Sequence, residues 1–183
     1  MKNPTKKVLI SLLVSLLMFS FALDIKAQEK KPTKKKRVVG MEIGNILPSF
    51  TLNDNNGNPV TLSKLRGKVM IVEFWGSWCK YCRKANPDMV LMYNKFKSED
   101  FEMIGVAIDE SREEWLEAIK KDKLPWLQVS EQKNWPDSKV VQKYKLEGVP
   151  STFLLDRKGV ILAINPSDEE IDNAIKKPKK EEK

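Results

Sequence analysis

The pattern of apolar and polar positions predicts a chain of alternating strands and helices. Residues 69–75 form a β-branched and apolar run that only Glu73 interrupts, which is typical of a buried central strand. Residues 80–98 instead repeat apolar side chains at helical spacing. The expected strands are 50–52, 60–62, 69–75, 103–108, 127–129, 152–155 and 160–164, and the expected helices are 80–98, 111–121, 138–144 and one capped by Ser167.

This order of elements predicts one α/β domain, whose mixed central sheet has helices on both faces. The first two strands flank the turn-rich run 53–57, so we expect them to form an extra N-terminal β-hairpin. The last two strands, joined across 156–159, are expected to form a closing hairpin. The domain is expected to span residues 42–175, a length too short for two domains that each bury a core of their own.

The N-terminus has the pattern of a secretory signal peptide, expected at residues 1–27. Three lysines precede an uncharged apolar stretch of 16 residues, from Val8 to Leu23. A membrane-spanning helix needs roughly 20 apolar residues. We expect cleavage after Ala27, with cleavage after Ala22 and an uncleaved anchor as the alternatives. Cleavage at either site would release the domain into the periplasm or outside the cell, whereas an uncleaved anchor would hold it at a membrane, facing the periplasm.

The net charge of +8 belongs to the ends of the chain. Residues 1–27 carry +3, residues 28–37 carry +5 and residues 176–183 carry +3, so the remainder carries −3. Lysine-rich segments without aromatic residues are typical of solvated, disordered chain. We therefore expect a basic linker at 28–41 and a basic tail at 176–183. Neither has aromatic residues for base stacking, which argues against nucleic acid, while weak contact with an anionic membrane surface stays open.

The candidate chemistry lies in Cys79 and Cys82, because the chain has no other cysteine and no histidine. A disulfide across two intervening residues restrains little chain and adds little stability. Without histidine, neither a Ser-His-Asp nor a Cys-His nucleophile can be built. A zinc site would have only two thiolates plus carboxylates, so no metal is expected. The C-x-x-C spacing therefore predicts a redox pair, with chance cysteines or half of a metal site as the alternative.

The place of the pair, between the strand 69–75 and the helix 80–98, assigns a role to each thiol. Cys79 stands where the free N–H groups and positive dipole end of a helix stabilise a thiolate, and Lys80 adds a positive charge. Cys79 is therefore the expected nucleophile, which forms a mixed disulfide with a substrate. Cys82 lies on the same helical turn and is the expected resolving thiol.

The segment 72–82, VEFWGSWCKYC, resembles the active-site segment of thioredoxins, and especially of the exported TlpA/ResA-like reductases. The run LRGK at 65–68 and the run EGVPSTFLLD at 147–156 match the same subgroup. The resemblance spans about residues 43–175. It implies a thioredoxin fold, a redox-active Cys79–Cys82 disulfide, protein substrates and no bound cofactor.

The resemblance also implies a substrate-binding surface beside the cysteine pair. Pro150 corresponds to the family's cis-proline, which leaves the backbone of Val149 free to pair with a substrate strand. From the sequence alone, a trans proline that starts the next strand is the alternative. Trp78 and Thr152 are expected at the same surface. Three further tryptophans are expected to be packing residues: Trp115, Trp126 and Trp135.

Glu73 occupies the position of the buried carboxylate that relays the proton of the resolving cysteine in thioredoxins. Burial would raise its pKa toward the range of a general base. The alternative is that strand alternation points Glu73 at an edge or at solvent. Thioredoxins place a lysine near this carboxylate on the neighbouring strand, whereas 103–108 has none.

These features predict a reductase of disulfides in exported proteins. The electrons would come from a membrane donor, because the chain has no G-x-G-x-x-G motif for a nicotinamide. Oxidation and isomerisation use the same chemistry and differ mainly in reduction potential. A client-binding module with idle thiols and a peroxide reductase are two further hypotheses. A peroxide reductase would carry its reactive cysteine in a Pro-x-x-x-Thr/Ser-x-x-Cys context, and the expected proline is absent here.

Overall fold

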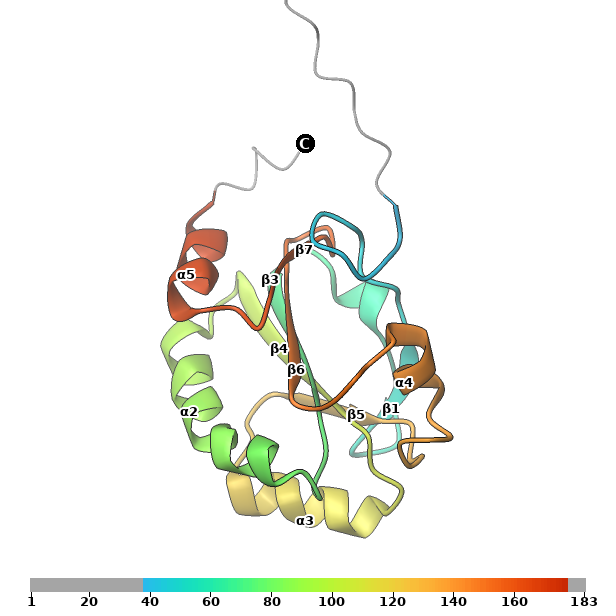
Figure 1. Cartoon of the computed structure of the whole chain (residues 1–183). Coiled ribbons are helices and arrows are strands. Elements are labelled where there is room, and N and C mark those ends of the chain that lie inside the picture. Colours follow the sequence, from blue (N-terminus) through green and yellow to red (C-terminus); the bar gives the residue numbers. More distant parts are fainter. Residues whose placement is uncertain (1–37, 178–183) are drawn as a thin grey trace, which may run out of the picture. The chain divides into compact units, whose positions relative to one another are not determined.

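The computed structural model describes residues 38–177, and Figure 1 shows their arrangement. The predicted leader and most of the predicted basic linker and tail lie outside these residues. The strands are β1 (Thr51–Asp54), β2 (Pro59–Thr61), β3 (Val69–Trp75), β4 (Phe101–Ala107), β5 (Leu127–Ser130), β6 (Ser151–Leu155) and β7 (Ile161–Ile164). The helices are η1 (Leu62–Leu65), α2 (Lys80–Phe96), α3 (Arg112–Asp122), α4 (Lys139–Tyr144) and α5 (Asp168–Lys176).

The strands form one seven-stranded mixed sheet in the order β2-β1-β5-β4-β3-β6-β7. The central strand β3 pairs parallel with β4 and antiparallel with β6. On the other side of β4, β5 is parallel to β4 and antiparallel to β1, which pairs with β2. Both parallel connections cross over through a helix, so the carboxyl ends of β3, β4 and β5 lie at the same edge of the sheet.

The two faces of β3 pack into two separate cores. Val69, Ile71 and Trp75 pack with buried residues of α2, α3 and α5, whereas Met70 and Phe74 pack with η1 and α4. Figure 1 shows the same division, with α2 and α5 on one side and α4 on the other. Because strand residues alternate between faces, Glu73 belongs to the face that α2 covers. The predicted mixed sheet with helices on both faces is therefore what the structure contains.

The helix starts follow the predicted capping residues. Ser111 accepts a hydrogen bond from Glu114 N at the start of α3. Ser167 forms a capping box with Glu170 at the start of α5, where three acidic residues occupy the first turn. No helix in residues 38–177 is long and apolar enough to cross a membrane.

Among the boundaries that differ from the sequence pattern, three involve specific contacts. Leu62, expected at the end of a strand, begins the helix η1 and buries its side chain. β4 begins two residues earlier than predicted, at Phe101, because its register with β3 continues to Val69. Val38 O accepts a hydrogen bond from Ile46 N, so ordered backbone contacts begin inside the segment that the sequence assigned to the linker.

Candidate active site

Cys79 is the N-cap residue of α2. Its Sγ accepts a hydrogen bond from Cys82 N at 3.1 Å, as the side-chain oxygen of serine or aspartate does in an ordinary cap. Its sulfur therefore lies where the free N–H groups of the helix point, an environment that stabilises a thiolate. Cys79 and Cys82 are joined by a disulfide. Cys79 is 5% exposed and Cys82 is 0% exposed, so of the two cysteines only Cys79 retains solvent-accessible surface.

The loop before β6 lies directly against this sulfur. The peptide bond between Val149 and Pro150 is cis. Val149 O lies 3.6 Å from Cys79 Sγ, although the two residues are 70 positions apart. Val149 is half-buried and Pro150 is exposed, so the backbone of this loop is accessible beside the disulfide.

Thr152 lies further along β6, as the register partner of Glu73 in β3. Its N–H donates to Asn165 Oδ1 at 3.1 Å, and its carbonyl accepts from Asn165 N at 2.7 Å. The backbone of Thr152 is thus occupied within the closing hairpin. Its side chain lines a pocket of about 270 Å³, whose apolar residues include Met89 and Met92 of α2.

Exposed aromatic rings surround the cysteine pair. Trp78 is 54% exposed and donates from Nε1 to Ile108 O at 2.7 Å, which fixes the ring over the end of β4. Tyr81 is 79% exposed. Trp135 is half-buried against the core on the α4 side, as predicted for a packing residue, and it also packs edge-on against Trp78, with ring centroids 6.5 Å apart. Trp115 and Trp126 are buried core residues.

Glu73 is only 2% exposed, so the alternative that strand alternation turns it to solvent does not hold. It lies between Ile71 and Trp75 on the face of the sheet whose core includes both cysteines. Desolvation raises its pKa from 4.5 to about 7. Its Oε2 is buried and has no hydrogen-bond partner. A carboxyl group in this position can hold or release a proton near neutral pH.

A polar network that the sequence pattern does not reveal holds the loop between β3 and α2. Asp109 is buried, and both of its carboxylate oxygens accept a hydrogen bond from Ser77 N at 3.1 Å. Desolvation raises the pKa of Asp109. Arg83 donates to Ser77 O at 3.1 Å and forms a two-pronged pair with Asp122 of α3. Asp109 lies two residues after the end of β4, so its place at the same sheet edge as Cys79 could have been inferred from parallel pairing.

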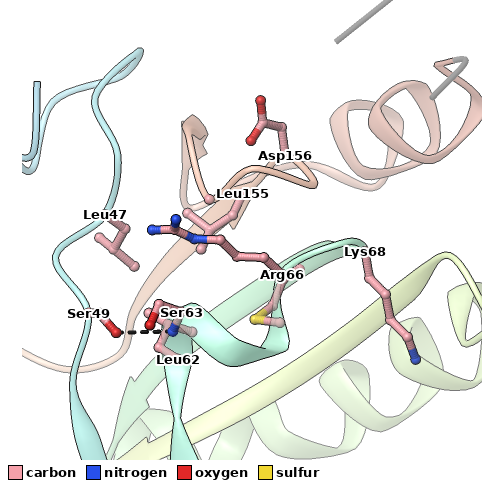
Figure 2. Close-up of a pocket in the computed structure, with 10 residues that line it drawn as sticks. Leu47, Ser49, Leu62, Ser63, Arg66, Lys68, Leu155 and Asp156 are labelled. Carbon is pink, nitrogen blue, oxygen red and sulfur yellow. Dashed lines mark hydrogen bonds between the residues drawn. The ribbon is translucent and has the colours of Figure 1, made fainter. Parts of the chain in front are cut away.

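A small pocket at the other end of β3 is shown in Figure 2. It is lined by Lys68 and Met70 at the start of β3 and by Asp156 after β6. Its volume of about 10 Å³ has room for about one water molecule, which is too little for an organic cofactor. Within residues 38–177, no three His, Cys, Asp or Glu side chains are grouped to hold a metal ion.

Comparisons with known proteins agree with this geometry. The model of the AhpC/TSA family matches residues 43–164. The thiol-disulfide oxidoreductase ResA of Bacillus subtilis is 32% identical over 121 residues, which are 66% of this chain and 65% of that protein. ResA of Bacillus cereus is 32% identical over 122 residues, which are 67% of this chain and 68% of that protein.

A solved structure extends the similarity to the fold. The thioredoxin domain of a thiol-disulfide oxidoreductase from Bacteroides vulgatus is 34% identical to this chain, with a TM-score of 0.66. The similarity covers 74% of this chain and 96% of that domain. The predicted thioredoxin fold is thereby confirmed. With its C-x-x-C pair at the start of α2, the chain belongs to the AhpC/TSA family and, within it, to the thioredoxin-like thiol-disulfide oxidoreductases.

Proposed function

We propose that this protein reduces disulfides in exported proteins by dithiol–disulfide exchange at Cys79 and Cys82. The observation that carries the proposal is that, of two bonded cysteines at the start of one helix, only Cys79 retains solvent-accessible surface. Cys79 Sγ lies at the cap of α2, beside an accessible loop, whereas Cys82 is fully buried. One sulfur is thus placed to meet a client and the other to act only within the protein.

The reaction begins from the reduced pair. The Cys79 thiolate attacks one sulfur of a client disulfide, forms a mixed disulfide, and the other client sulfur leaves as a thiolate. Cys82 then loses its proton and attacks Cys79 Sγ. This step restores the Cys79–Cys82 disulfide and releases the second client sulfur as a thiolate. Two electrons have moved from the pair to the client.

Glu73 is the proposed acceptor of the proton of Cys82. Cys82 is fully buried in the core that includes Ile71 and Trp75, and Glu73 is buried between these two residues on the same face of β3, so no bulk water reaches the thiol. A general base is most effective when its pKa lies near the working pH, and the pKa of Glu73 is about 7. The carboxylate would take the proton as Cys82 attacks, and give a proton back to the Cys82 thiolate when the pair is reduced again.

The proposed client groove consists of the Val149–Pro150 loop, Trp78 and the side chain of Thr152. An extended client segment that pairs with the Val149 backbone would place its sulfur next to Cys79 Sγ, because Val149 O is 3.6 Å from that atom. Trp78 would cover the other side of the segment, with its ring fixed through Ile108 and Trp135. Aromatic side chains of this kind commonly dominate the binding energy of an interface.

Replacement of Trp78 by alanine is expected to raise the KM for a disulfide-containing protein client roughly tenfold. The rate with a small linear disulfide such as hydroxyethyl disulfide should change little, because that compound reaches Cys79 without filling the groove. Steady-state reduction assays measure both values. Leu91→Ala removes another exposed apolar side chain, from α2, and is the matched control. Equal losses with protein and small disulfide would argue against a client contact.

The proposed setting is the periplasm or the exterior of the cell. The predicted signal peptide at 1–27, or an uncleaved anchor, would deliver the domain, and the basic linker and tail would at most touch an anionic membrane surface. A membrane protein would then supply electrons to the Cys79–Cys82 disulfide. These elements rest on the sequence pattern of the leader and tails.

The direction of the reaction is tested by the reduction potential of the pair. The domain is equilibrated in glutathione or dithiothreitol buffers of defined ratio, and its free thiols are counted. We expect a potential near that of thioredoxin, about −270 mV, as a reductase requires. A value near about −120 mV would identify an oxidant of the same fold instead. A pair that never titrates would leave only a client-binding module.

A further inference from the structure

A buried carboxamide lies in register with the buried carboxyl group of Glu73. Glu73 in β3 pairs with Gly105 in β4, and Gly105 pairs with Gln128 in β5. The three residues therefore form one row across three neighbouring strands. Gln128 is buried like Glu73, and the glycine between them contributes no side chain.

The amide of Gln128 occupies the space that a side chain at position 105 would fill. A Cβ atom on Gly105 would collide with Gln128 Oε1 and would lie 2.8 Å from Gln128 Nε2. The amide thus reaches from β5 over β4 toward β3. Trp75 of β3, two residues from Glu73, donates from Nε1 to Gln128 Oε1 at 3.0 Å. Trp75 and Glu73 lie on the same face, so the amide lies on the face of Glu73.

The hydrogen bond from Trp75 uses the oxygen of the Gln128 amide and leaves its NH₂ group available. Gln128 Oε1 is occupied as an acceptor, which leaves Nε2 as a donor. Nε2 is buried and has no hydrogen-bond partner, and the same is true of Glu73 Oε2. Unpaired buried polar atoms are uncommon in proteins and costly. A donor and an acceptor left unpaired on the same face, in the same row of residues, are complementary.

Ionisable groups near Glu73 are few. On this face β4 contributes Met103, Gly105 and Ala107, and β6 contributes Thr152 and Leu154, none of which ionises. α2 contributes Cys82 and, further along the same core, Tyr93, with Cys79 at its N-cap. Asp88 of α2 lines the pocket that Thr152 also lines, and β5 contributes Gln128. Desolvation is the cause of the raised pKa of Glu73, with no charged neighbour contributing. The lysine expected beside this carboxylate in thioredoxins has no counterpart here.

We propose that the Nε2 group of Gln128, held over Gly105 by its bond to Trp75, donates a hydrogen bond to the Glu73 carboxylate and keeps Glu73 in its proton-accepting form. Gln128 is thus a positioning residue for the proton relay, and this inference rests on the proposed role of Glu73. A donor stabilises the charged form of a carboxyl group, so it opposes the effect of burial. Without it, burial alone sets the pKa of Glu73 at about 7, so a larger share of the molecules would carry a protonated Glu73 at neutral pH and could not receive the proton of Cys82.

The test replaces Gln128 by methionine, which has a similar length and no N–H group. We expect the pKa of Glu73, followed by the ¹³C shift of its carboxyl carbon, to rise by about one. The second measurement starts from a mixed disulfide between Cys79 and an aromatic thiol, which Cys82 resolves by displacing that thiol. The rate of this displacement should fall up to about tenfold at pH 7 and approach the rate of the unmodified protein at higher pH. Gln142→Met, on the exposed face of α4, is the control for the same chemical change.

A second variant distinguishes the loss of the hydrogen bond from a packing defect caused by methionine at position 128. Gly105→Ala keeps Gln128 but displaces its amide, and it should move the pH midpoint in the same direction. In a Glu73→Gln background, Gln128→Met should no longer alter the pH profile. An unchanged Glu73 pKa in Gln128→Met, or an equal loss of rate at every pH, would overturn the inference. If Glu73→Gln itself leaves the profile intact, the relay proposal fails instead.

Discussion

Cys79→Ser is expected to lower the turnover of client disulfides at least about a thousandfold, because it removes the nucleophile. Cys82→Ser should give a different result. Its Cys79 can still attack a client, but no buried thiol is left to displace the client sulfur. The variant should therefore accumulate as a stable mixed disulfide. Non-reducing gel electrophoresis after mixing with a disulfide-containing protein, followed by mass spectrometry of the adduct, measures both outcomes.

The asymmetry between the two variants is the informative result. It follows from the 5% exposure of Cys79 and the complete burial of Cys82. The double variant with both serines should neither turn over nor trap a client, and serves as the control for non-covalent binding. Trapping by Cys79→Ser through Cys82 would show that the roles are reversed. Unchanged non-covalent client binding in both variants, with no mixed disulfide in Cys82→Ser and no turnover by the unmodified protein, would favour a binding module.

Much of this fold is predictable because its patterns are local. The run 69–75 is apolar because β3 is buried on both faces, and its one carboxylate is conspicuous for the same reason. The helix starts follow from serines whose side chains cap the next N–H groups. Cys79 follows this rule too, since it caps α2 with its sulfur. The chemistry of the site and the start of its helix are thus encoded in the same short segment.

The surroundings of the cysteine pair depend on contacts that the local pattern does not contain. Trp135 packs on Trp78 from a loop 57 positions away, and its sequence context resembles that of any packing tryptophan. Gln128 lies in a strand of four residues, where nothing signals that its amide crosses a glycine to reach Trp75. Such pairs follow from the strand order and register, which the sequence pattern alone did not provide.

Glu73→Gln is expected to make the protein more stable at alkaline pH and less active. The carboxyl group of Glu73 keeps its proton in the folded protein up to about pH 7, but ionises near pH 4.5 in the unfolded chain. Its stabilising contribution is therefore fully present below pH 4.5 and is lost as the pH rises to 7. Glutamine cannot ionise, so the variant does not lose this contribution. The advantage of the variant over the unmodified protein in free energy of unfolding should therefore be about 3 kcal/mol larger at pH 8.5 than at pH 4.

Urea unfolding of the oxidised domain at pH 4 and pH 8.5 measures this difference, with the exposed Glu99→Gln as the control. In the same variant the displacement of a client by Cys82 should slow roughly a hundredfold at pH 7, because the proton of Cys82 has lost its acceptor. Higher stability with normal activity would mean that Glu73 is a buried charge without a part in the reaction. Opposite changes in stability and rate would mean that the protein retains an unfavourable buried carboxylate because the second step of disulfide exchange requires it.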